Sequence, residues 1–144
     1  MITEIPVATI AHAIQLAVAP VFLLTGVASV LSVLTTRLGR IIDRSRFLHG
    51  KSLETQDDDQ CIQGELISLT RRGRLIHWAI GLCTLCLLLI CAVVGVLFLG
   101  AFFKINLPVV IATLFVAAML SLCIALLNFI CEIFLATAQV RSGH

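Results

Sequence analysis

The chain has 144 residues, which is room for one domain, but its composition is too apolar for a soluble one. Sixty per cent of the residues are hydrophobic and 12% are charged, and the mean hydropathy is +1.10, whereas soluble domains carry about a quarter charged residues. A soluble domain of this size buries only about 60–70% of its unfolded surface, so too much apolar area would face water. This excludes a disordered chain, a nucleic-acid-binding tail and a secreted disulfide framework, and it indicates a protein partly surrounded by lipid.

Three long runs without Asp, Glu, Lys or Arg predict membrane-spanning helices. The runs cover residues 5–36, 75–103 and 105–131, and each exceeds the roughly 20 residues that a helix needs to cross the hydrocarbon core. Because lipid offers the backbone no hydrogen-bond partner, such runs must be helical. We expect an all-α membrane protein, one membrane domain over residues 1–144, with transmembrane helices at 12–35, 77–99 and 108–131. No Lys or Arg precedes the first run as in a signal peptide, so we expect this helix to be retained.

The segment between the first two spans, residues 36–75, contains eight of the ten Lys and Arg residues. The positive-inside rule places this segment in the cytoplasm, with the N-terminus outside and the C-terminus inside. Two apolar heptad patterns predict that the first and second helices extend past the bilayer as a cytoplasmic antiparallel helical hairpin. The pattern positions are Val27, Leu31, Leu34, Leu38, Ile41, Ser45 and Leu48, and then Ile62, Leu66, Leu69, Gly73, Ile76 and Ile80. Gly50 is expected to end the first helix, and Asp57, Asp58 and Asp59 to begin the second.

A stripe of small and hydroxylated residues runs along the opposite side of the first helix. At roughly 100° per residue it lies about 180° from the apolar pattern, and it contains Thr25, Ser29, Ser32, Thr36, Gly39, Asp43 and Arg46. Small residues at this spacing let helices approach closely in lipid. The third helix carries a matching stripe of Ala118, Ser121, Ala125, Asn128 and Glu132. Because a compact three-helix bundle cannot use two opposite faces of one helix, the monomer is either a flat layer or part of a homo-oligomer, and we favour the oligomer.

Charged residues near the inner membrane boundary predict an ion-pair cluster. Glu132 is expected near Thr36, Arg37 and Arg40. Asp43 and Glu65 are expected to neutralise some of the arginines, either through pairs three or four residues apart on one helix (Asp43 with Arg40 and Arg46) or across the hairpin. The remaining basic residues attract anionic lipid headgroups by about 1 kcal/mol each, and the candidates for this contact are Arg44, Arg71, Arg72 and Arg74.

No set of residues in the sequence resembles a catalytic, cofactor-binding or metal-binding site, so we expect no enzyme, no cofactor and no nucleic-acid partner. Cys83 and Cys86 form a CxxC pair inside an apolar helix, where a thiolate is disfavoured, and we interpret them as packing residues. His12 and His77 lie near opposite membrane surfaces, which argues against a haem between them.

Two functional hypotheses remain open. The first is a membrane protein that acts by self-assembly or by contact with a partner. The alternative is a homo-oligomeric channel lined by the face of the first helix that carries Thr25, Ser29, Ser32 and Thr36, with a gate in its apolar outer half. Glu132 is an ionisable residue near a helix interior and is a further candidate for a role in transport or gating.

Two basic motifs and the helix before them carry a resemblance to a known family. The run RLGRIIDRSR, residues 37–46, follows a helix containing PVFLLTG, residues 20–26, and the second basic group is RRGR, residues 71–74. In these motifs and in its three-helix layout the chain resembles the bacterial membrane family catalogued as domain of unknown function 2721. The resemblance implies a bacterial inner-membrane location and supplies no activity or catalytic residue.

Overall fold

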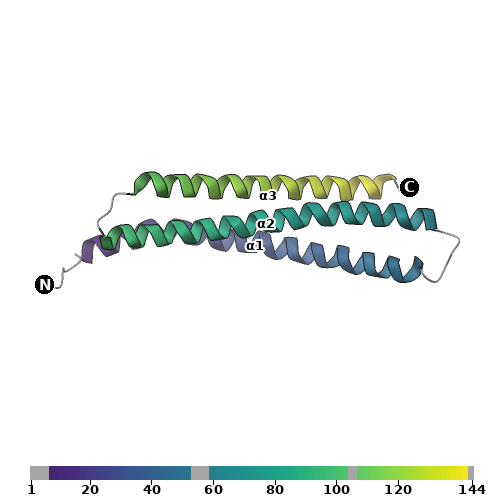
Figure 1. Ribbon diagram of the computed structural model, residues 1–144, viewed down its shortest axis with the longest axis horizontal. Coiled ribbons are helices and arrows are strands. Elements are labelled where there is room, and N and C mark those ends of the chain that lie inside the picture. The colour runs from purple at the N-terminus through teal and green to yellow at the C-terminus, as the bar shows by residue number, and fades with distance from the viewer. Residues whose placement is uncertain (1–6, 53–58, 104–106, 143–144) are drawn as a thin grey trace. The chain divides into compact units, whose positions relative to one another are not determined.

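The computed structural model describes residues 7–52, 59–103 and 107–142, and within these ranges it contains three helices (Figure 1). They are α1 (Val7–Ser52), α2 (Asp59–Phe103) and α3 (Pro108–Ser142). Each is long and apolar enough to cross a membrane. The expectation of an all-helical protein with three candidate membrane-spanning helices is therefore confirmed, whereas the limits of the spans and their orientation stay predictions.

The helix ends follow local chemistry with one exception. The helix α2 begins at Asp59, while Asp57 and Asp58 lie outside the described residues. Pro108 begins α3, where a missing N–H is harmless, and the Ile111 N–H donates to the Leu107 carbonyl at 3.2 Å. Gly50 does not end the first helix, because α1 continues through it to Ser52.

The three helices contribute to two compact units, each with a core of its own. The first unit contains the helical residues within 7–30, 83–103 and 108–123. The second contains those within 31–52, 59–82 and 124–142. Each unit therefore holds a segment of all three helices.

The core of the first unit is built largely from small side chains. Its buried residues are Ala13, Ala17 and Val27 of α1, Cys83, Cys86, Ile90 and Val93 of α2, and Ala118 and Ser121 of α3. The Ser121 hydroxyl donates to the Ala118 carbonyl at 2.8 Å, so this buried polar group is satisfied within α3. Both cysteines of the CxxC pair are free and buried, as their interpretation as packing residues requires. Small residues at these positions let the helices approach closely, which is how helices associate in lipid.

The core of the second unit repeats every seven residues. Its buried apolar residues include Leu34, Ile41 and Leu48 of α1 and Ile62, Leu69 and Ile76 of α2. The backbone of α2 comes close to α1, since a Cβ built on Gly73 would lie 3.7 Å from Ile41 Cγ2. The expectation that the apolar heptad positions face the core is therefore confirmed in this unit.

Large apolar side chains cover the outer surface of both units. Phe22, Leu88, Leu127 and Phe134 are each more than 60% exposed. Apolar surface of this extent is unfavourable in water but suits contact with lipid.

This burial pattern predicts how two matched substitutions in α2 affect stability. We expect Ile90→Ala to lower the free energy of unfolding by about 2–5 kcal/mol, because Ile90 is fully buried and its removal leaves a cavity. Leu88→Ala removes a similar side chain that is 64% exposed, so we expect a change within about 0.5 kcal/mol. Equilibrium unfolding in mixed detergent micelles measures both, and equal losses would contradict the assignment of the lipid-facing side.

Candidate functional site

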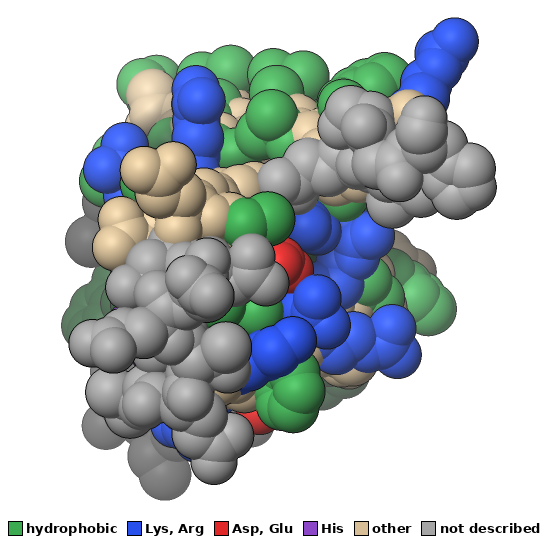
Figure 2. Space-filling model, turned by 90° about the vertical axis from the view of Figure 1, so that its right-hand side faces the viewer, with side chains coloured by type: hydrophobic (Ala, Val, Ile, Leu, Met, Phe, Trp, Pro, Cys, Tyr) green, Lys and Arg blue, Asp and Glu red, His purple; other side chains and the backbone are tan. Residues whose placement is uncertain are grey.

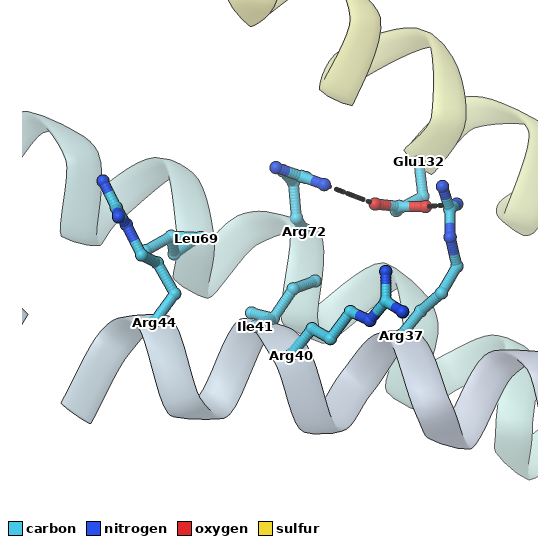
Figure 3. A pocket seen from close by; sticks show the side chains of 7 residues that line it. All are labelled: Arg37, Arg40, Ile41, Arg44, Leu69, Arg72 and Glu132. Carbon is cyan, nitrogen blue, oxygen red and sulfur yellow. Dashed lines mark hydrogen bonds and ion pairs between the residues drawn. The ribbon is translucent and has the colours of Figure 1, made fainter. Parts of the chain in front are cut away.

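The second unit contains a polar cavity of about 270 Å³, which we call the arginine pocket. It is lined by residues of all three helices, namely Arg37, Arg40, Ile41, Arg44, Leu69, Arg72 and Glu132 (Figure 3). On the face drawn in Figure 2, Lys and Arg side chains gather around an acidic side chain. Four cationic side chains and a single acid in one cavity make it the strongest candidate site among the described residues.

The spacing of the arginines along α1 explains why they converge. Arg37, Arg40 and Arg44 follow one another at intervals of three and four residues, which brings them to one side of the helix. Ile41 lies between them and is buried against the backbone of α2. Burial of the apolar heptad therefore sets the rotation of α1 that turns the three arginines toward the pocket.

Glu132 of α3 is the acidic centre of the pocket and is 1% exposed. Its Oε2 accepts a hydrogen bond from Arg37 Nη1 at 2.5 Å. Its Oε1 accepts two from Arg72, at 3.2 Å from Nε and 2.8 Å from Nη2. In Figure 3 the carboxylate lies between the two guanidinium groups, so a single side chain of α3 binds both α1 and α2.

The other arginines of the pocket have different surroundings. The Cζ atom of Arg37 also lies 5.3 Å from the centroid of the Phe129 ring, in cation–π range. Arg44 donates from Nε and Nη2 to Glu65 Oε1, at 3.1 and 3.0 Å, as expected for a pair across α1 and α2. Arg40 is exposed, and no ion pair or side-chain hydrogen bond of Arg40 is found within the described residues.

The expected ion-pair cluster is only partly assembled. Glu132 meets Arg37, and Arg40 lines the same cavity. Asp43 is exposed and forms no ion pair with Arg40 or Arg46 within the described residues, so the expectation of pairing along α1 is wrong. Asp43 lies three residues from each of these arginines, close enough to pair, but Arg40 lines the arginine pocket instead. Asp43 and Arg46 are both exposed, and an exposed ion pair gains little free energy.

The four candidates for lipid contact divide into two groups. Arg44 and Arg72 line the arginine pocket. Arg71 and Arg74 line a separate, more open hollow together with His49, Leu66, Ile67 and Thr70. Adjacent residues of a helix point about 100° apart, and Arg71 and Arg72 accordingly line different cavities.

The two stripes of small residues differ in their exposure. On α3, Ser121 and Glu132 are buried and Asn128 is half-buried, so this stripe is used within the chain. On α1, Thr25 and Ser29 of the first unit and Ser32 and Thr36 of the second are all exposed. The stripe of α3 therefore contributes contacts within one copy of the chain, through Glu132 to Arg37 and Arg72, whereas the stripe of α1 stays exposed.

Two contacts of the site were missed from the sequence, those of Glu132 with Arg72 and of Arg37 with Phe129. A signal for the first existed. In the predicted antiparallel hairpin the chain reverses after Gly50. This pairing brings Arg72 level with the helical turn of the first helix that contains Arg37 and Arg40. The Phe129 contact has no such signal, since it depends on the rotation of α3.

The arrangement is suited to binding anions and offers little for catalysis or metal binding. Guanidinium groups donate hydrogen bonds but do not act as acids or bases near neutral pH. The one carboxylate is held by two of them and is almost completely removed from solvent. Within the described part of the chain, no group of three or more His, Cys, Asp or Glu residues is arranged to hold a metal ion.

Matched glutamine substitutions test how much the central carboxylate contributes to the free energy of unfolding. We expect Glu132→Gln to lower the free energy of unfolding by about 3 kcal/mol, because it leaves Arg37 and Arg72 without their buried counter-charge. Glu65→Gln removes an acid that is 41% exposed, so we expect a loss of at most about 1 kcal/mol. Chemical unfolding in micelles measures both values, and a smaller loss for Glu132→Gln than for Glu65→Gln would show that the bridge is not central.

Comparisons with known proteins identify the family but no characterised relative. The model of a family described as "Protein of unknown function (DUF2721)" matches residues 17–142, which include all three helices and every residue of the arginine pocket. No curated protein and no solved structure matches the chain. The extent of the family match nevertheless covers most of the chain, and the protein therefore belongs to the DUF2721 family.

Proposed function

We propose that this protein is a multi-pass protein of the bacterial inner membrane that acts by self-assembly rather than by catalysis, with the stripe of α1 as the contact surface. The observation that carries the proposal is the exposure of Thr25, Ser29, Ser32 and Thr36, although the equivalent stripe of α3 is buried. Close helix contact is what such residues favour in lipid. A second copy of the chain is the occupant that fits this face, because no described element of the first copy covers it.

The hydrogen bonds of the stripe's hydroxyl groups favour a helix-packing role for the stripe and argue against its lining a water-filled pore. The Ser29 hydroxyl donates to the Thr25 carbonyl at 3.0 Å, and the Thr36 hydroxyl donates to the Ser32 carbonyl at 2.9 Å. The donor capacity of Ser29 and Thr36 is therefore satisfied within α1. These two hydroxyls can meet another helix without becoming unpaired buried donors, whereas a channel lining depends on hydroxyls that face water.

Charge at the end of the stripe also suits a second copy. Asp43 and Arg46 lie on the same stripe, are exposed, and form no ion pair within the described residues. In a symmetric pair of parallel α1 helices each acid lies near the basic residue of the other copy. Such pairs fix the register of two helices more than they add affinity.

The proposed orientation has residues 36–75 in the cytoplasm as an extension of α1 and α2. It rests on the eight Lys and Arg residues in this segment, against two in the rest of the chain. The ion pair between Arg44 and Glu65 joins the two helices in this region and suits an antiparallel hairpin outside the lipid.

Disulfide cross-linking tests the assembly surface. In a background where the four exposed cysteines (Cys61, Cys91, Cys123 and Cys131) are replaced by alanine, we expect Ser29→Cys and Ser32→Cys to form dimers in native membranes. Control substitutions at Leu88 and Leu127, which are exposed on the other two helices, are expected to stay monomeric. Monomer at every position, or equal dimer at all four, would contradict the proposed interface.

Ion flux separates assembly from the alternative channel. Protein reconstituted into liposomes is expected to leave flux at the background of empty liposomes. Flux above background that Ser32→Leu abolishes would contradict the proposal and favour a pore lined by α1.

Labelling of the native Cys61 tests the orientation. This thiol is exposed and lies near the start of α2, outside the predicted spans. We expect a membrane-impermeant maleimide to label it in inverted inner-membrane vesicles and not in intact spheroplasts, because its segment is cytoplasmic. A Cys61→Ala variant gives the background from the other cysteines, and labelling in intact spheroplasts would reverse the orientation.

A further inference from the structure

The arginine pocket carries more positive charge than its ion pairs neutralise. Four guanidinium groups line it, and the carboxylates bonded to them are Glu132 and Glu65. The four arginines therefore carry two more positive charges than these carboxylates neutralise, and Arg40 is the one with no acidic partner within the described residues. Clustered like charges repel one another, so the cavity attracts an anion from outside the chain.

We propose that the arginine pocket binds a phosphate group, carried either by an anionic lipid headgroup or by a small soluble phosphate. Guanidinium groups match phosphate oxygens by paired, parallel hydrogen bonds, which ammonium groups do not form. All the cationic residues lining this pocket are arginines. The cavity of about 270 Å³ has the volume of roughly nine water molecules, enough for a phosphate group with part of its hydration shell.

Glu132 prepares the pocket for such a ligand. It holds Arg37 and Arg72 from two different helices through three hydrogen bonds, so neither guanidinium has to be ordered when the ligand arrives. Each arginine has five N–H donors, and the bonds to Glu132 occupy one of Arg37 and two of Arg72. The remaining donors are available to a second anion, and preorganised donors bind more tightly than mobile ones.

Arg40 is the residue that distinguishes a binding site from a structural ion-pair cluster. The bridge through Glu132 uses Arg37 and Arg72, and Arg44 is bonded to Glu65. Arg40 lines the same cavity and contributes to neither pair, as its position in Figure 3 shows. If the cluster only stabilised the fold, the presence of Arg40 in the cavity would have no explanation, whereas an external phosphate provides a partner for it.

The floor of the pocket strengthens the attraction. Ile41 and Leu69 line it and are 9% and 7% exposed. Apolar walls lower the local dielectric constant, so a charge-assisted hydrogen bond beside them is worth more than the same bond in open water.

A matched pair of arginine variants tests the proposal. Arg40 and Arg46 are both exposed residues of α1, but only Arg40 lines the pocket. The purified full-length protein is placed in phosphatidylcholine nanodiscs and titrated with inorganic phosphate, and separately in nanodiscs containing increasing fractions of phosphatidylglycerol. Retained ligand is measured by native mass spectrometry, and stabilisation by the shift in thermal unfolding midpoint.

We expect Arg40→Gln to weaken binding of the effective probe about tenfold, the loss of one charge-assisted contact, and Arg46→Gln to change it by less than about twofold. Saturation by phosphatidylglycerol but not by inorganic phosphate identifies a lipid headgroup as the source, and the reverse identifies a soluble phosphate. Binding of neither probe, or equal weakening by the two variants, overturns the proposal, because non-specific attraction to net charge does not distinguish Arg40 from Arg46. The assay does not depend on self-assembly, so its result stands whether or not cross-linking detects a dimer.

Discussion

The second unit depends on one buried carboxylate that satisfies two arginines from different helices. Glu132 bonds to Arg37 of α1 and Arg72 of α2, and it is 1% exposed. Removing a charge from water is costly unless it is paired and hydrogen-bonded, so the rotation of α3 is restricted to one that keeps both contacts. Ala125 lies seven residues before Glu132 on the same side of α3 and is buried as well. The bridge therefore also keeps this side of α3, with its small residue Ala125, inside the chain.

The features that follow from local pattern could be predicted, and those that follow from helix rotation could not. Absence of charge and a period of seven are properties of a single segment, so the spanning helices and buried positions such as Leu34 and Ile76 were evident in the sequence. The pairing of Arg37 with Glu132 required only their similar depth. Predicting that the second partner of Glu132 is Arg72 and not Arg40 requires knowledge of how the three helices are rotated relative to one another. The contact between Arg37 and Phe129 depends on the same rotations. The predicted pairs of Asp43 with Arg40 and Arg46 lie within α1 and failed for a different reason, since exposed ion pairs gain little free energy.

The arginine pocket separates what stabilises the fold from what remains available for a ligand. The bridge through Glu132 is internal and is complete without any external group. The excess charge lies instead at Arg40, whose side chain is exposed and contributes to no ion pair in the described part of the chain. A site built this way can lose its ligand without losing its fold, because the two roles rest on different side chains. Lysines would serve less well, since their ammonium groups bind at one point and cannot share oxygens in a planar, two-pronged fashion.

The basic motif at residues 37–46 can be explained as three interleaved helix faces. Leu38, Ile41 and Ser45 belong to the apolar heptad and are buried or half-buried. Arg37, Arg40 and Arg44 line the arginine pocket, while Gly39, Asp43 and Arg46 continue the small-residue stripe. Each turn of α1 thus supplies one residue to the core, one to the pocket and one to the stripe, as a period of 3.6 residues allows. Two arginines that look equivalent in the sequence, Arg40 and Arg46, therefore serve different surfaces, and the effect of any substitution in this motif depends on its direction around the helix rather than on its charge.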